Sequence, residues 1–369
     1  MKPVYIVSWL FALAISFVSC DDWLDKTPKD RLYPDVYFKT EDELRLFTNQ
    51  FYNNLVPSAV DIYSESSDLI VKSDLMLEMS GQRIIPDEGN GWNFTALRDI
   101  NFYLQYSHNC TEVNARNRYD GVARFFRAYF YFEKVKRYGD IPWYDKALDS
   151  DDPELYKARD SREFVMQKML EDLDFAIANL PKTKNAYVLT RWTALALKSR
   201  VCLFEGTFRK YHGLEDCEKY LNACVSASET FMNESGYTLY KSGSTPYRDL
   251  FASINLQADE VIFGRDYEAS LSVLHNVQNY ENSTTMGRPG MNKKIVNSYL
   301  MADGSRFTDK AGYETMTFDQ ECQNRDPRLA QTIRTPGYTR IGSTKKEAPN
   351  LAYTMTGYHL IKYSMTANY

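Results

Sequence analysis

The chain has 369 residues, with 44 Lys and Arg against 49 Asp and Glu and a net charge of −5. This balance and the lack of a long basic run argue against a nucleic-acid partner, which needs a basic footprint on the protein. Hydrophobic residues (44%) and charged residues (25%) occur in the proportions of a soluble globular protein with one large core or two domains. Aromatic residues reach 14%, led by 28 Tyr, which suits a surface that recognises an amphipathic ligand, because the tyrosine ring stacks and its hydroxyl forms hydrogen bonds.

The N-terminus has the pattern of a targeting segment. Lys2 supplies a positive charge, and the apolar run from Val4 to Val18 is short for a membrane span. Ser19 directly before Cys20 resembles a bacterial lipobox, whose cysteine is lipidated after cleavage. We therefore expect a lipoprotein signal peptide over residues 1–19, then the lipidated Cys20 and an extended tether up to residue 40. A plain signal peptide or a buried hydrophobic start is the alternative.

An amphipathic helix is predicted over residues 41–56, where Leu44, Phe47 and Phe51 recur at steps of three and four. Thr40 and Glu43 form a capping box at its start. Residues 57–91 read as an irregular polar stretch, which in compact domains is often functional. A second helical stretch begins at Trp92.

The central feature of the chain is an aromatic helix over residues 124–137. Six of the eight residues from Phe125 to Phe132 are aromatic and cover every side of a helix, so other helices must enclose it. Asp120 is the expected N-cap and Gly139 the left-handed C-cap, and Pro142 prevents a restart.

Further amphipathic helices are predicted over residues 161–180, 190–206 and 214–231, the first with a capping box of Asp160 and Glu163. Short connections between such helices indicate antiparallel hairpins. From residue 236 onward, short apolar runs such as 261–263 predict isolated strands in a loop-rich region.

Neither the cysteines nor the histidines indicate a metal site or a cofactor. Five cysteines follow Cys20, and no C-x-x-C occurs. Cys217 and Cys224 lie two helical turns apart, about 10 Å, which is too far for a disulfide. We interpret the five as small core residues. The four histidines lack zinc-ligand spacing.

Several segments resemble the SusD/RagB family of surface lipoproteins. The pattern R-A-Y-x-Y-F-x-x-V-x-x-Y-G-D-I-P occupies residues 127–142, and ALKSRVCLFEG (196–206) matches a pattern that often follows it. IVNSYLMADG (295–304), expected as a helix ending in Asp-Gly, and NRDPRL (324–329) resemble later landmarks of the family, in the right order.

The resemblance implies a mainly α fold, with a tetratricopeptide-like scaffold of helical hairpins over residues 41–235 and a loop-rich ligand-binding region over 236–369. It further implies non-catalytic glycan capture at the outer membrane by a lipid-anchored, surface-exposed protein, with delivery to a SusC-like TonB-dependent transporter. Family members usually continue into a further helical pair, whereas this chain ends at YHLIKYSMTANY. We therefore expect a C-terminally truncated member, with part of helices 124–137 and 190–206 left uncovered.

In SusD-like proteins the ligand site is made by loops away from the scaffold, which here fall near residues 81–93 and 265–290. Aromatic rings there would take the apolar face of a sugar, and polar side chains its hydroxyl rim. The candidate ligand-binding residues, chosen by loop position, are Arg83, Trp92, Asn93, Tyr267 and Tyr280.

Two alternatives remain open. A secreted all-helical glycoside hydrolase would need a pair of carboxylates, which the acidic loop with Asp149, Asp151, Asp152 and Glu154 could supply. No other catalytic motif occurs in the chain. A peptide-binding relative of the same family is the second alternative.

Overall fold

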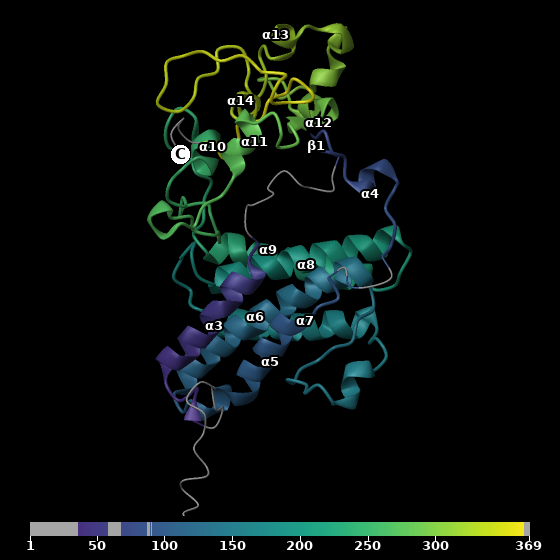
Figure 1. Ribbon diagram of the computed structural model, residues 1–369, viewed down its shortest axis with the longest axis vertical. Helices are drawn as coiled ribbons and strands as arrows, with labels where there is room; N and C mark the ends of the chain where they lie inside the picture. The colour runs from purple at the N-terminus through teal and green to yellow at the C-terminus, as the bar shows by residue number, and fades with distance from the viewer. Residues whose placement is uncertain (1–35, 58–67, 87–88, 90, 365–369) are drawn as a thin grey trace, which may run out of the picture.

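The computed structural model describes residues 36–57, 68–86, 89 and 91–364. Figure 1 shows long helices in the lower part of the molecule and short helices joined by loops in the upper part. The prediction of a mainly α fold is confirmed. The expected signal peptide, Cys20 and most of the tether lie outside the described residues.

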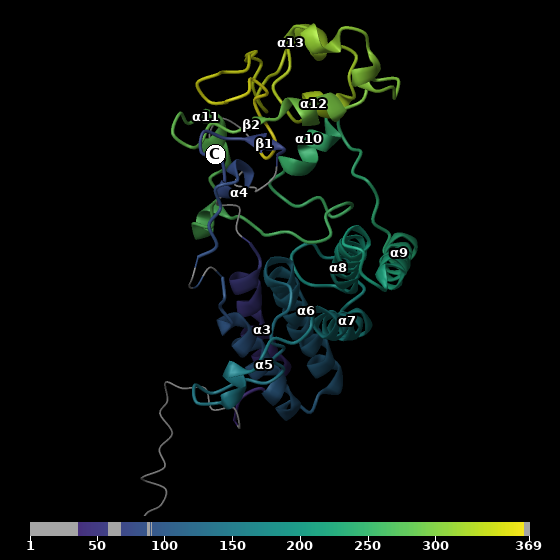
Figure 2. The ribbon, with the colours of Figure 1, turned by 90° about the vertical axis from the view of Figure 1, so that its right-hand side faces the viewer.

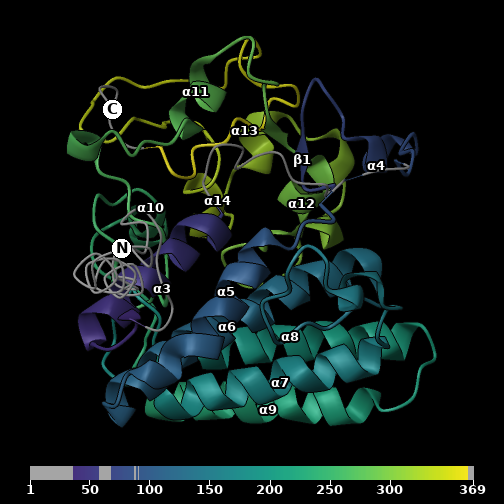
Figure 3. The ribbon, with the colours of Figure 1, turned by 60° about the horizontal axis from the view of Figure 1, so that its bottom comes forward.

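The lower part, here called the scaffold, consists of long helices. They are α3 (Glu41–Leu55), α5 (Thr95–Tyr106), α6 (Val113–Tyr138), α7 (Arg162–Asn179), α8 (Arg191–Tyr211) and α9 (Cys217–Glu234). In Figure 3, α6 to α9 run side by side as stacked hairpins, and α3 and α5 pack on α6. The capping box of Thr40 and Glu43 at the start of α3 is confirmed.

Several predicted helix boundaries were wrong. Helix α6 begins at Val113, so Asp120 lies inside it; its first turns are polar in sequence, but Ala115, Tyr119 and Val122 face the core. Helix α7 is capped by Ser161, because the Asp160 carboxylate accepts the backbone N–H of Trp143 instead.

Three other scaffold helices also differ from their predicted boundaries. Helix α5 begins at Thr95 rather than at Trp92, and α9 begins at Cys217. Helix α8 runs past Gly206 to Tyr211. Gly206 lies inside α8 and permits the close approach of α9, because a Cβ there would lie 2.8 Å from the Leu221 side chain.

The aromatic helix α6 is enclosed as predicted, and a buried ion pair fixes its orientation. Arg127 donates to both carboxylate oxygens of Asp172 on α7, each at 2.7 Å, and both side chains are under 10% exposed. Arg127 also donates to Asn101 on α5 at 3.2 Å. Three helices therefore share one buried polar contact.

The exit from α6 folds back onto the same helix. Gly139 ends α6 with a φ of 71°, and the ring of Trp143 stacks on Tyr131 at 4.2 Å. The Tyr131 hydroxyl accepts the backbone N–H of Tyr144 at 2.6 Å. Asp140 accepts the backbone N–H of Arg162, so the Gly-Asp-Ile-Pro turn also caps α7.

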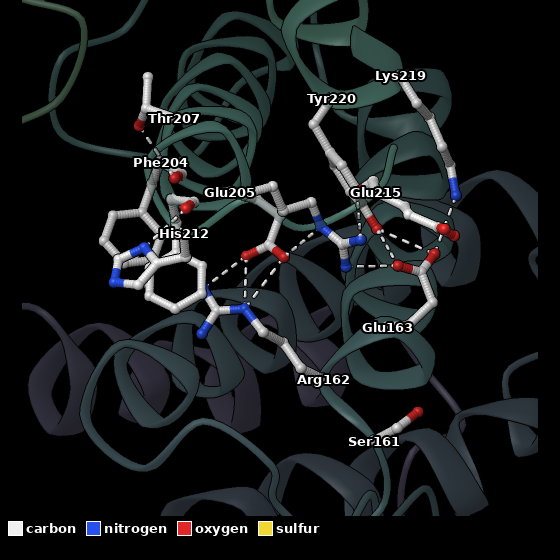
Figure 4. A network of polar contacts seen from close by, with 12 residues as sticks. Ser161, Arg162, Glu163, Phe204, Glu205, Thr207, His212, Glu215, Lys219 and Tyr220 are labelled. Atoms are coloured by element: carbon white, nitrogen blue, oxygen red, sulfur yellow. Dashed lines mark hydrogen bonds and ion pairs between the residues drawn. The ribbon is translucent and has the colours of Figure 1, made fainter. Parts of the chain in front are cut away.

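A second polar network, built on Glu205 and Glu163, joins α7, α8 and α9 (Figure 4). Glu205 is fully buried and accepts hydrogen bonds from Arg162, at 2.8 and 3.0 Å, and from Arg209, at 2.8 Å. Glu163 pairs with Arg209 and accepts from Lys219 and Tyr220 of α9. This network explains the Glu-Gly pair of ALKSRVCLFEG structurally, because the glutamate joins α7 to α8 and the glycine admits α9.

The upper region has little regular structure. Its elements are β1 (Ile70–Val71), α4 (Leu77–Ser80), α10 (Pro246–Phe251), α11 (Val277–Asn282), β2 (Gly290–Met291), α12 (Lys293–Ser298), α13 (Phe318–Glu321) and α14 (Pro327–Ala330). Its core is a separate cluster of buried residues. Residues 68–86 belong to this region although they precede the scaffold helix α5, as the blue segment in Figures 1 and 2 shows.

The two strands pair with each other, antiparallel, with Ile70 opposite Met291 and Val71 opposite Gly290. Gly290 is required there, because a Cβ would lie 2.3 Å from the hydroxyl of Thr356. The expected strand at 261–263 is absent; these half-buried residues pack against scaffold side chains without a pairing partner, as Phe263 does on Tyr52.

The two late family landmarks, residues 295–304 and 324–329, stabilise the upper region through hydrogen bonds. The Arg325 guanidinium donates to the carbonyls of Val296, Tyr299 and Glu321 at 2.7–2.9 Å. Asp326 caps α14. The helix expected to end in Asp-Gly stops earlier, at Ser298, and Asp303 forms a turn in which it accepts the N–H of Ser305.

Breaking the Arg127–Asp172 pair will destabilise the scaffold. Asp172→Asn leaves the buried guanidinium without its counter-charge, and we expect a loss of roughly 3–5 kcal/mol in the free energy of unfolding. The matched control is Glu171→Gln on the same helix, which removes an exposed pair with Lys168 and should cost under about 1 kcal/mol. Urea denaturation measures both, and equal small effects would show that the pair carries no such role.

Acid will weaken the upper region through His359, which is 1% exposed. Its Nδ1 accepts the Asn350 N–H, so Nε2–H donates to the Glu281 carbonyl at 3.0 Å. Burial, reinforced by the charge of Arg334, lowers the pKa of His359 to about 4. Below pH 6.5 His359 binds a proton in the unfolded chain but stays neutral in the folded chain. The free energy of unfolding therefore falls as pH decreases toward 4.

Denaturation at pH 7 and pH 5 checks this effect. We expect the wild type to lose about 2 kcal/mol more than His359→Gln over that interval. The variant keeps the other titrating groups, so its own loss between pH 7 and pH 5 measures their contribution. Identical losses would mean that His359 is protonated in the folded protein.

Candidate functional site

The first cavity near a predicted ligand loop lies between α10 and α11, with a volume of about 440 Å³. We call it the Tyr267 cavity. Its walls combine aromatic rings, amide side chains and one carboxylate, including Phe251, Asn255, Asp266, Tyr267, Asn276 and Asn279. The volume falls within the range typical of small-molecule sites, about 300–1,000 Å³.

The lining of the Tyr267 cavity contains a buried amide oxygen and a histidine. The Oδ1 atom of Asn276 is buried and accepts no hydrogen bond from the described part of the chain. The ring of Tyr267 packs edge-on against His275 at 4.9 Å between centroids. Burial lowers the pKa of His275, which favours its neutral form. The cavity thus offers amide and imidazole donors and acceptors, together with the charged side chains of Arg265 and Asp266.

Hydrogen bonds to the scaffold hold the loop that carries Tyr267 in place. Gly264 donates its N–H to the Ala186 carbonyl at 2.9 Å, and Arg265 donates to the Val56 carbonyl at 3.3 Å. Leu256 donates its N–H to the hydroxyl of Tyr187. These bonds join a loop of the upper region to the ends of scaffold elements, so the cavity wall has a fixed base.

A second cavity, of about 570 Å³, lies between the start of α5 and the loop 142–159. We call it the Trp92 cavity. Trp92 is 40% exposed and contacts Phe94 and Tyr138 edge-on, at 5.3 and 4.9 Å. The guanidinium of Arg159 lies 5.0 Å from the centre of the Trp92 ring.

The floor of the Trp92 cavity is tied to the buried ion pair. Asn101 lines the cavity and donates to the carbonyls of Tyr144 and Lys146, at 2.9 and 3.3 Å. The other end of its amide accepts from Arg127. The loop that carries Lys146 is thus positioned through Asn101 by the Arg127–Asp172 pair.

The structure does not bring the five predicted residues together. Trp92 lines one cavity and Tyr267 the other. Asn93 accepts the N–H of Thr95 at 2.8 Å and so shapes the start of α5. Arg83 lies after α4, half-exposed, and pairs with Glu78 at 3.6 Å.

Tyr280 requires a correction. Its side chain is 4% exposed and belongs to the core cluster of the upper region, because α11 turns this face inward with Val277. Its ring therefore offers no open face to a ligand. Sequence reasoning missed Asn255, Asn276 and Asn279, whose only signal was an amide-rich composition near Tyr267.

Within the described ranges, no group of three His, Cys, Asp or Glu gathers as a metal site would require. The described cysteines are all free thiols; Cys110 and Cys202 are buried and the other three are half-buried. The search of the same residues finds no helix that is long and apolar enough to span a membrane.

Comparisons with known proteins agree with this fold. Residues 80–191 match a SusD-like family described as starch-binding and associating with the outer membrane, and residues 250–369 match the SusD family. SusD-like protein P2 of Formosa agariphila is 26% identical over 294 residues, covering 74% of this chain and 55% of the relative. The chain spans about half the length of the curated relatives it matches.

Solved structures show the same fold. A SusD-like protein from Bacteroides fragilis superposes with a TM-score of 0.73 at 21% identity, covering 93% of this chain and 73% of that one. A SusD-like carbohydrate-binding protein from the same species gives 0.68 at 17% identity, covering 88% and 68%. The matched segments, the helical hairpins and the shared fold together show that this chain belongs to the SusD/RagB family.

Proposed function

We propose that this chain captures glycans without chemical conversion and presents them to a TonB-dependent transporter at the outer membrane. The observation that carries the proposal is the composition of the Tyr267 cavity, which places aromatic rings beside amide groups. Membership of a family described as starch-binding and associating with the outer membrane supports it. Lipid attachment at Cys20 and exposure at the cell surface belong to the same proposal.

Binding would follow from the two-sided chemistry of a sugar. The ring of Tyr267 would take the apolar C–H face, and Asn255, Asn276 and Asn279 would take the hydroxyls. A buried acceptor without a partner costs about 1–3 kcal/mol. Rotation of the Asn276 side chain would bring Oδ1 within reach of a sugar hydroxyl, whose hydrogen bond would recover this cost, whereas an apolar ligand would not.

The hydrolase alternative receives little support from the described cavities. The Tyr267 cavity is lined by one carboxylate, Asp266, and the Trp92 cavity by none. Glycoside hydrolysis requires two facing carboxyl groups. In the acidic loop, Asp152 and Glu154 both pair with Lys146, and Asp149 is 85% exposed beside Arg98.

The peptide-binding alternative predicts a different lining. In one recurring mode of peptide capture, the peptide pairs its backbone with a strand edge. The described strands span two residues each and already pair with each other. The amides around the Tyr267 cavity are side-chain groups, from Asn255 in the loop after α10 and from Asn276 and Asn279 at the start of α11. Such side-chain groups suit scattered hydroxyls better than a regular backbone.

Affinity electrophoresis of the chain from residue 21 against a panel of neutral polysaccharides tests the proposal. We expect retardation by at least one polymer and no release of sugar. Tyr267→Ala should weaken that binding by roughly fivefold, because a lost aromatic contact is worth about 0.5–1.5 kcal/mol. Asn276→Ala should weaken it without removing an aromatic ring.

The control is Tyr211→Ala, which removes an 81% exposed tyrosine at the end of α8. It should leave the retardation unchanged. Release of reducing sugar by the wild type would favour the hydrolase. Retardation by no glycan in the panel, from a protein with a cooperative unfolding transition, would refute capture.

A further inference from the structure

We infer that the Trp92 cavity is a second binding site, which takes an acidic saccharide such as a uronate- or sulfate-bearing glycan. The first observation is the charge of its lining. Four cationic side chains and no carboxylate face the cavity, and the cations are Arg98, Lys146, Lys157 and Arg159. A low-dielectric wall with charges of one sign concentrates ligands of the other sign.

The carboxylates that balance these cations lie outside the cavity lining. Arg98 approaches Asp149 at 3.7 Å, Lys146 approaches Glu154 at 2.9 Å, and Lys157 approaches Asp160 at 3.0 Å. The first two pairs are largely exposed, and exposed pairs contribute little to stability. An anionic ligand in the cavity can therefore share these cations without breaking a strong contact.

Arg159 is the cation most available to a ligand. It stands over the ring of Trp92 and makes no ion pair with a described carboxylate. Two further cations, Lys134 and Arg137, lie close to the neighbours of Trp92. Lys134 contacts the carbonyl of Gly91, and Arg137 lies over the ring of Tyr138, which packs against Trp92. Neither forms an ion pair within the described chain, so like charges gather here around one aromatic group.

The state of Lys134 reflects its burial first and this crowding second. Burial, and then the charge of Arg137, lowers the pKa of Lys134. Its ammonium group contacts the carbonyl of Gly91 and lies near the Phe94 ring. A negative charge bound nearby would relieve the repulsion between these cations.

The walls favour a saccharide over an acidic peptide. Trp92, Phe94 and Tyr144 supply the aromatic surface that a sugar ring covers. A peptide would also seek backbone acceptors, but three carbonyls of the loop already accept hydrogen bonds from side chains. The carbonyls of Tyr144 and Lys146 accept from Asn101, and that of Leu148 accepts from Arg98.

The site is also preorganised. Asn101 fixes the loop of Lys146 and is itself held by Arg127. Cations mounted on a loop held in this way lose less freedom when they bind, and the ligand retains more of the interaction energy. This inference concerns a ligand class and a location separate from the Tyr267 cavity.

Matched polymers provide the test. The probes are sodium polygalacturonate and the same polymer after chemical reduction of its carboxyl groups, which removes the charge and keeps the sugar rings. We expect the wild type to bind the acidic polymer at least roughly tenfold more tightly at low salt, and to lose most of that difference at high salt. Arg159→Gln and Lys146→Gln should each weaken binding of the acidic polymer several-fold, and neither should change binding of the reduced one.

Two controls assign the effect to the cavity. Lys210→Gln removes an exposed cation at the end of α8, outside the cavity, and should bind like the wild type. Tyr267→Ala should also bind the acidic polymer normally, which separates this site from the proposed neutral-glycan site.

Equal binding of both polymers, or unchanged binding by Arg159→Gln and Lys146→Gln, would overturn this inference and leave the Tyr267 cavity untouched. Poly-glutamate competing as well as polygalacturonate would assign the cavity to acidic peptides and overturn the saccharide part. Failure of the neutral panel alone would refute only the proposed function.

Discussion

The structure depends above all on the buried pair of Arg127 and Asp172. A charge pair of this kind is expensive to desolvate, and it is stable here because both oxygens of the carboxylate are bonded and the arginine also reaches Asn101. The pair gives one defined rotation to a helix whose aromatic surface would otherwise pack in several ways. Through Asn101 it also sets the loop that walls the Trp92 cavity.

The upper region is held by a different principle. Its strands are two residues long and its helices have six residues or fewer, so regular backbone bonding cannot stabilise it alone. Single polar side chains that bind several carbonyls take that role, as Arg325 does. The loops of such a region can vary while these few polar side chains keep their contacts. This arrangement suits ligand recognition on a constant scaffold.

Prediction from sequence succeeded where the determinants were local. The capping box of Thr40 and Glu43 and the C-cap at Gly139 depend on neighbouring residues, and both were found. The start of α6 was missed because its polar first turns are helical through tertiary contacts of Ala115 and Tyr119.

The sites illustrate the same limit. Tyr267 and Tyr280 are the same residue type in one stretch, yet one lines a cavity and the other fills a core. Only the packing of α11 decides between them. The cations of the Trp92 cavity come from α5 and from a loop some fifty residues later, and no local pattern joins them.

The most direct measurement is a crystal structure of the protein grown with a neutral oligosaccharide that it retains in solution. We expect an intact sugar in the Tyr267 cavity, with a ring against Tyr267 and its hydroxyls hydrogen-bonded to the amide side chains of the lining. A sugar bound only at another surface, or a cleaved product beside a pair of carboxylates, would contradict it.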